Sequence, residues 1–244
     1  MRFYEELNDF LPYARRRRDF AHNFRDSGSI KDLVESLGVP HTEIDLILVN
    51  GQSVDFGYQV QGGDRISVYP VFEALDISPV THLRPRPLRE PRFVLDSHLG
   101  RLAAYLRLLG FDCLYRNDYG DPILADISAR EQRILLTRDR RLLMLKQVTR
   151  GYYVRAHLPH AQLAEVMARF DLFSVRRPFT RCLHCNGLLH PVAKEVVAAR
   201  LPPRTRQYYD AFWQCDSCGK LYWKGSHYRR MQELLTHVEA AHSG

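Results

Sequence analysis

The chain has 244 residues, of which 45% are apolar and 26% charged, so it can bury a core and is neither disordered nor fibrous. No segment has the roughly 18 to 20 uninterrupted apolar residues of a membrane span, and the N-terminus lacks the apolar centre of a signal peptide. We therefore expect a cytoplasmic protein with no membrane partner. The net charge of +7, with arginines clustered in residues 15–18, 84–92 and 200–206, favours RNA or another polyanion as partner; the alternative explanation is solubility.

Residues 1–76 have the pattern of a small β-grasp domain. SIKDLVESLGVP predicts a helix with Ser29 as N-cap and Gly38 as its stop. IDLILVNGQSV predicts a strand that turns at Asn50–Gly51, and GDRISVYPV at residues 63–71 predicts a later strand. This order of elements predicts a helix that packs across a mixed sheet.

The GDRISVYPV strand resembles the last strand of the ubiquitin-like sulfur carriers. Those carriers end in a free Gly-Gly tail, whereas this chain continues through Asp76. The continuation argues against sulfur transfer and leaves a binding role, so we expect a protein partner or substrate at this domain.

Residues 77–91, ISPVTHLRPRPLREP, predict a linker. Proline lacks the amide donor and disfavours helix in the residue before it, so the segment is expected to be extended and cationic. The alternative is an arginine arm that lies along a phosphate backbone.

Residues 92–175 alternate between predicted strands and helices. The strands are FVLD, FDCLY, RILLT and GYYVRA, and the helices are SHLGRLAAYLRLLG, PILADISAREQ, RRLLMLKQ and LPHAQLAEVMARF. Such alternation with short links predicts a parallel sheet covered on both faces. Ligands of open parallel sheets bind beyond the carboxyl ends of the strands.

Three acids are predicted to lie beyond the carboxyl ends of these strands, where open parallel sheets bind their ligands. FVLD ends at Asp96, RILLT runs into Asp139, and Asp121 is predicted as an N-cap with Pro122 at the first helical position. Carboxylates that converge repel one another unless a divalent cation neutralises them, and oxygen ligands favour Mg²⁺ or Mn²⁺. The arrangement predicts metal-assisted phosphodiester hydrolysis.

Each of these acids also has a plainer interpretation as a helix cap or turn residue. Asp118 and Asp126 compete with Asp121 for the third position. Arg101 and Arg138 are candidates for binding phosphate, although an arginine near carboxylates is as often part of a structural ion pair.

Residues 176–244 are predicted to form a zinc ribbon and a C-terminal helix. They contain two C-x-x-C pairs, which are Cys182, Cys185, Cys215 and Cys218. Two such pairs complete a tetrahedral four-thiolate site, and zinc is preferred to disulfides in a cytosolic chain. The alternatives are a redox pair or two unrelated turns. A closed four-thiolate site serves folding and binding and not catalysis, and Cys113 is expected to be a small buried hydrophobe.

These motifs together resemble the Mut7-C family. The resemblance rests on FVLDSHLGRLAAYLRLLGFDCLYRND, RILLTRDRRLL, FTRCLHCNGLLHPV and FWQCDSCGKLYWKGSHYRRM, in this order. It implies an α/β protein with an N-terminal ubiquitin-like β-grasp domain, a central PIN-like nuclease domain and a C-terminal zinc ribbon. It also implies an RNase whose metal-binding acids are Asp96, Asp121 and Asp139. PIN domains often add an acid after the fourth strand, where GYYVRAHLP has none.

The leading hypothesis is therefore a Mg²⁺- or Mn²⁺-dependent RNase with structural zinc. The alternative is a noncatalytic RNA-binding adaptor that keeps the fold. His227 is a further candidate for contacting RNA. Trp213, Tyr222 and Trp223 either stack bases or form the core of the ribbon.

Overall fold

A computed structural model of the chain describes residues 1–24, 28–70, 83, 91–225, 228–229, 232–233 and 236. The chain divides into two compact units, one of Met1–Glu90 and Gly120–Tyr153, the other of Pro91–Tyr119 and Val154–Gly244. Within the described ranges, no helix is long and apolar enough to cross a membrane. Most of the predicted linker, and His227, lie outside the described residues.

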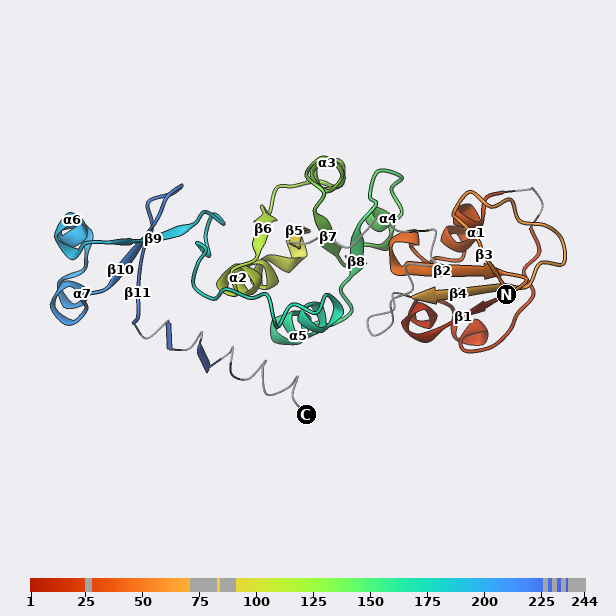
Figure 1. Cartoon of the computed structure of the whole chain (residues 1–244), viewed down its shortest axis with the longest axis horizontal. Helices are drawn as coiled ribbons and strands as arrows, with labels where there is room; N and C mark the ends of the chain where they lie inside the picture. The colour runs from red at the N-terminus through yellow and green to blue at the C-terminus, as the bar shows by residue number, and fades with distance from the viewer. Residues whose placement is uncertain are drawn as a thin grey trace. The chain divides into compact units, whose positions relative to one another are not determined.

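The N-terminal sheet is mixed, as expected of a β-grasp domain (Figure 1). Its strand order is β1-β4-β2-β3, in which β1 runs parallel to β4 and β2 runs antiparallel to both β3 and β4. The strands are β1 (Arg2–Phe3), β2 (Ile44–Val49), β3 (Gln52–Ser53) and β4 (Ile66–Pro70). Asn50 and Gly51 have φ values of 52° and 85°, which form the predicted two-residue hairpin turn between β2 and β3.

Helix α1 (Ile30–Ser36) forms where the sequence predicts it. The Ser29 side chain accepts a hydrogen bond from the Asp32 amide at 3.2 Å, and Gly38 has a φ of 87° just after the helix. The described residues of the domain also form three short 3-10 helices: η1 (Glu5–Phe10), η2 (Tyr13–Arg15) and η3 (His41–Glu43). Apolar side chains of η1, α1, β2 and β4 form one buried core.

The central region, residues 92–175, contains two parallel strand pairs, β5 (Arg92–Leu95) with β6 (Asp112–Tyr115), and β7 (Ile134–Thr137) with β8 (Gly151–Tyr153). They belong to a sheet of order β6-β5-β7-β8, which confirms the predicted parallel sheet. The helices here are η4 (Ser97–Leu99), α2 (Gly100–Leu108), α3 (Asp121–Glu131), α4 (Arg140–Leu143) and α5 (Pro159–Arg169).

Helix α4 is shorter than the predicted RRLLMLKQ helix. Leu142 and Leu143 are buried, but residues 145–147 are exposed and the Val148 amide donates to the Leu145 carbonyl in a turn. The apolar face therefore lasts only one turn, and α4 ends there.

The C-terminal part has the architecture expected of a zinc ribbon. Antiparallel strands in the order β11-β10-β9 form its sheet: β9 (Leu189–Val192), β10 (Phe212–Cys215) and β11 (Leu221–Trp223). Short helices lie between the cysteine pairs: α6 (Lys194–Val197), η5 (Ala198–Arg200) and α7 (Pro203–Tyr208). A small core is formed by Val197, Leu201 and Phe212.

Candidate metal centre and strand-end acids

The first cysteine pair lies in a tight turn closed by backbone hydrogen bonds. The Cys182 amide donates to the Gly187 carbonyl at 2.8 Å, and the Asn186 amide donates to the Cys182 carbonyl at 2.9 Å. Asn186 follows the second cysteine and has a φ of 74°, which few residues other than glycine and asparagine adopt. A Cβ atom at Gly187 would lie 2.8 Å from the Cys215 sulfur, so a larger residue there would displace this sulfur.

The second cysteine pair repeats this turn position by position. The Cys215 amide donates to the Lys220 carbonyl at 3.0 Å, and the Gly219 amide donates to the Cys215 carbonyl at 3.0 Å. Gly219 has a φ of 67°, like its counterpart in the first pair. The two pairs are thus equivalent knuckles, each of which directs two sulfurs to one side.

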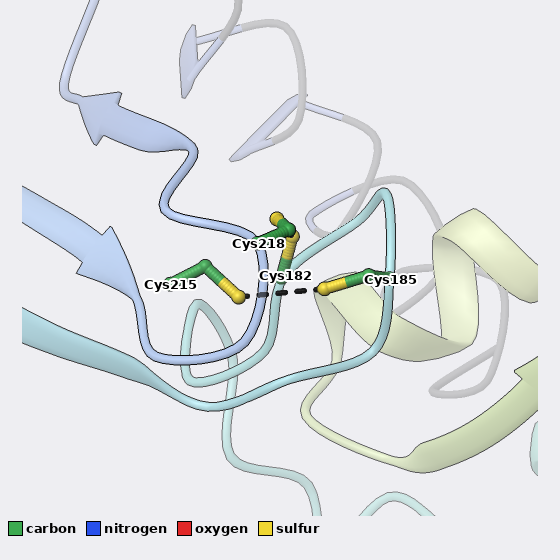
Figure 2. A group of neighbouring side chains, drawn as sticks. All are labelled: Cys182, Cys185, Cys215 and Cys218. Carbon is green, nitrogen blue, oxygen red and sulfur yellow. Dashed lines mark hydrogen bonds between the residues drawn. The ribbon is translucent and has the colours of Figure 1, made fainter.

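The sulfur atoms of the four cysteines form one cluster, as Figure 2 shows. All of them lie within 4.8 Å of one another, with 3.7 Å between Cys182 and Cys218 and 3.4 Å between Cys185 and Cys215. A tetrahedral site with Zn–S bonds of about 2.3 Å requires sulfurs about 3.8 Å apart. The cluster therefore has the size and chemistry of a structural zinc site, which agrees with the expectation from the sequence.

The thiols have unequal environments. Burial raises the pKa of Cys182, but hydrogen bonds from the Tyr222 hydroxyl, 3.1 Å away, and from backbone amides outweigh it and lower the pKa to about 7. Burial among neighbouring thiols raises the pKa of Cys185 to about 12. Four thiolates at this spacing repel one another, so a bound cation is needed to keep them ionised together.

Arg107 joins the first knuckle to strand β6 of the central region. Its buried guanidinium donates from Nε to the Cys113 carbonyl at 2.9 Å. Its Nη1 donates to the carbonyls of Leu183 and His184 at 3.1 and 2.9 Å, and these two residues separate the cysteines of the first pair. One side chain of α2 therefore binds both β6 and the knuckle.

Asn186 makes a second connection to β6. Its Oδ1 accepts from the Cys113 amide at 2.9 Å, and its Nδ2 donates to the Asp112 carboxylate at 2.8 Å. Cys113 is fully buried, as expected, and side chains satisfy both of its backbone groups. Among the strands that the structure describes, β6 is an outer one, so the side chains of Arg107 and Asn186 satisfy backbone groups that a further strand would otherwise bind.

Asp96 directly follows β5 and is buried. Its Oδ1 accepts hydrogen bonds from the Ser97 amide and hydroxyl at 2.5 and 3.1 Å, so it is the N-cap of η4. The Tyr115 hydroxyl at the end of β6 donates to the Ser97 carbonyl at 3.0 Å. The plainer interpretation as a helix cap is therefore confirmed, and the metal role stays a prediction.

Asp139 is exposed and caps α4, with its Oδ1 accepting from the Arg141 amide at 2.7 Å. Its own amide donates to the Thr137 hydroxyl at 2.9 Å, which fixes the link between β7 and α4. Within the described residues, its Oδ2 accepts no hydrogen bond.

Asp121 is not the N-cap that the sequence predicts. Gly120 occupies that position, because its backbone is extended and its carbonyl accepts from the Leu124 amide at 3.0 Å. Asp121 is the first residue of α3 and is exposed, and Pro122 follows it. A carboxylate in the first turn still interacts favourably with the helix dipole.

The two competing acids both pair with arginine. Arg116 makes a bidentate contact with Asp118 at 2.9 and 2.7 Å, and this contact lowers the pKa of Asp118. Asp126 pairs with Arg130 at 3.4 Å one turn along α3. In the part of the chain that the structure describes, Asp121 has no such ion pair, so it is the better candidate of the three.

The predicted phosphate-binding arginines and the three acids are distributed over both units. Arg101 is exposed on α2 and Arg138 is half-buried after β7. Asp96 belongs to one unit, and Asp121 and Asp139 to the other. Their convergence stays a prediction.

Glu165 on α5 is an acid that the sequence pattern did not reveal. Its two carboxylate oxygens accept from the amides of Arg155 and Ala156, each at 2.8 Å, in the segment after β8. It lies ten residues from the first of these amides, and no local motif predicts such a contact. Its observed role is to fix this segment.

The fold and the cysteine cluster define a mixed α/β protein with a ribbon-type metal module. Residues 91–235 match the family model of the Mut7-C RNAse domain, and residues 1–76 match that of the Mut7-C ubiquitin domain. The first match covers more than half of the chain, so this chain belongs to the Mut7-C RNAse domain family, as the sequence resemblance indicated. No curated protein and no solved structure matches it.

Proposed function

We propose that this protein is a metal-dependent ribonuclease that hydrolyses RNA phosphodiester bonds with Mg²⁺ or Mn²⁺ bound by Asp96, Asp121 and Asp139. The observation that carries the proposal is the match of residues 91–235 to a nuclease family. It is supported by the position of Asp96 and Asp139 just after parallel strands, at the end where open sheets bind their ligands.

The donor set fits a hard divalent cation. All three candidate ligands are carboxylates, and Asp139 has one oxygen fixed by a capping bond and a second without a hydrogen bond in the described residues. Asp96 is held by two hydrogen bonds from Ser97, so its orientation is set before any ligand binds. A bound Mg²⁺ or Mn²⁺ would supply hydroxide from water and stabilise the leaving oxygen.

In this proposal the four cysteines hold zinc, which has no open coordination position for chemistry. The zinc site instead orders the ribbon, whose surface carries cations next to aromatic rings. Lys224 lies 5.8 Å from the Trp213 ring, and Trp213 is half-exposed. Bases can stack on such rings while lysine and arginine neutralise phosphates, so the ribbon, with Arg101 and Arg138, is proposed to bind RNA.

The test is cleavage of labelled RNA by zinc-loaded full-length protein with Mn²⁺. Asp96→Asn and Asp139→Asn should each lower the rate by more than about 100-fold, since groups that merely support a metal ligand are worth about 10- to 100-fold. Asp118→Asn and Asp126→Asn are matched controls, because these carboxylates already pair with arginines.

Two results would contradict the proposal. If Asp96→Asn and Asp139→Asn cut as fast as the unmodified protein, the site assignment is wrong. If the unmodified protein binds RNA tightly but cuts none with Mg²⁺ or Mn²⁺, the noncatalytic adaptor is the better description.

A further inference from the structure

The ubiquitin-like domain contacts the segment of the RNAse domain that carries Asp139. Glu43, at the end of η3, is 1% exposed, and its Oε1 accepts from the Tyr153 amide at 2.7 Å. Tyr153 ends β8, the last strand in the order of its sheet. In the part of the chain that the structure describes, no further strand lies beyond β8, and this carboxylate accepts the hydrogen bond from the outer amide instead.

His41, at the start of η3, holds the other end of the same segment. Its Nε2 is 2.9 Å from the carbonyl of Val148, a fully buried residue between α4 and β8. Its Nδ1 is 2.6 Å from the Glu35 carboxylate, so both ring nitrogens face acceptors. One turn of the ubiquitin-like domain thus binds residues 148–153 at both ends.

Arg140 extends this contact to the candidate acid. Its Nη1 donates to the Phe10 carbonyl at 3.3 Å, and its guanidinium carbon lies 4.9 Å from the Phe10 ring and 5.5 Å from the Tyr153 ring. The two rings meet edge to face at 5.4 Å. Arg140 directly follows Asp139 and is the first residue of α4.

The length of α4 makes this contact important. The helix has four residues, far below the roughly 12 to 15 that an isolated helix needs to be even marginally stable. Its position must therefore come from tertiary contacts, among which are the buried Leu142 and Leu143 and the Arg140 contact with Phe10. Asp139 caps this helix, so its carboxylate can be no better fixed than the helix is.

We propose that the ubiquitin-like domain acts within its own chain as a support of the nuclease site, with Arg140 as the residue that positions Asp139. The η3 surface is accordingly used internally and is not available to a separate protein. The catalytic part of this inference rests on the proposed function of Asp139, whereas the positioning part does not.

The experiment compares Arg140→Ala with Arg141→Ala in the zinc-loaded full-length protein. Arg141 is the neighbouring residue, its side chain is exposed, and only its backbone amide takes part in the cap. Hydrogen exchange of amides 139–153 and the Mn²⁺ concentration for half-maximal RNA cleavage are measured for both. Arg140→Ala should speed exchange of the Arg141 amide about tenfold and raise the Mn²⁺ midpoint several-fold, because loss of about 1.4 kcal/mol of local stability is a tenfold change.

A milder variant tests the same contact in case Arg140→Ala does not fold. Glu43→Gln keeps the side-chain volume and removes the carboxylate charge, which weakens the hydrogen bond from the Tyr153 amide, so exchange of that amide should rise by less than the Arg140→Ala effect.

The outcomes separate this inference from the proposed function. The inference is supported if Arg140→Ala, and not Arg141→Ala, shows faster exchange of the amide at residue 141 and a higher Mn²⁺ midpoint for RNA cleavage. Unchanged exchange in both Arg140→Ala and Glu43→Gln overturns it, whatever the cleavage rates. A third outcome is faster exchange in Arg140→Ala combined with normal RNA cleavage by Asp139→Asn. It supports the positioning of Asp139 by Arg140 and overturns the catalytic role of Asp139.

Discussion

The ubiquitin-like domain and the zinc ribbon differ in how they are stabilised. The first buries a large apolar cluster of its own, drawn from helices η1 and α1 and the strands beside them. The ribbon buries Val197, Leu201 and Phe212 and adds four clustered cysteines. From this difference we expect the ubiquitin-like domain to fold around its own core and the ribbon to depend on a bound metal.

The two modules nevertheless attach to the RNAse domain by the same kind of contact. In each case a buried side chain satisfies the backbone of an outer strand. Glu43 accepts from the Tyr153 amide of β8, while Asn186 of the first knuckle accepts from the Cys113 amide of β6. Only the second attachment passes through a metal-binding turn, so only the second should depend on zinc.

The largest expected effect is that of removing zinc. Binding of structural zinc is worth about 10 kcal/mol or more in apparent free energy, so a chelator should unfold the ribbon and speed exchange of amides 112–115 and 182–189 by orders of magnitude. Amides 44–49 in the ubiquitin-like domain should keep their protection. Equal loss of protection in both regions would remove the distinction between the two modules.

The next effect is that of Arg107→Ala. It leaves the carbonyls of Cys113, Leu183 and His184 without their buried donor and should lower the free energy of unfolding by about 3 kcal/mol. Arg101→Ala, on the exposed face of the same helix, should change it by less than about 0.5 kcal/mol. Urea denaturation of the zinc-loaded protein measures both, and similar values for the two variants would show that Arg107 does not hold the knuckle.

The smallest effect is that of Asn186→Gly. Glycine adopts the φ of 74° easily, so the turn and its zinc should remain, but the two side-chain bonds to β6 are lost. We expect a loss of about 1 to 2 kcal/mol of stability with unchanged zinc content. Zinc analysis beside the unfolding measurement checks this, and loss of zinc would mean that docking and metal binding cannot be separated.

Features set by neighbouring residues were predictable from the sequence. Ser29 as a cap, Asn50–Gly51 as a turn and the two C-x-x-C knuckles each depend on a few adjacent residues, and all are confirmed. The alternation of strands and helices likewise predicted the parallel sheet.

Features set by distant residues were not predictable. The contacts of Glu43 with Tyr153 and of Arg107 with Leu183 join residues 110 and 76 positions apart, and no periodicity marks them. The prediction for Asp121 was wrong by one residue because Gly120 provides the first helical carbonyl. The convergence of the three acids stays a prediction, since it depends on packing and not on local pattern.

The contact of Glu43 with β8 also has a consequence for solubility. An outer strand with a free amide is a template on which another chain can add a strand, and such addition leads to aggregation. Here the amide of Tyr153 is already occupied, and Val148 beside the strand is fully covered. A fragment that lacks residues 1–76 would free the Tyr153 amide and the Val148 carbonyl, so the RNAse domain is expected to self-associate when it is expressed without the domain that precedes it.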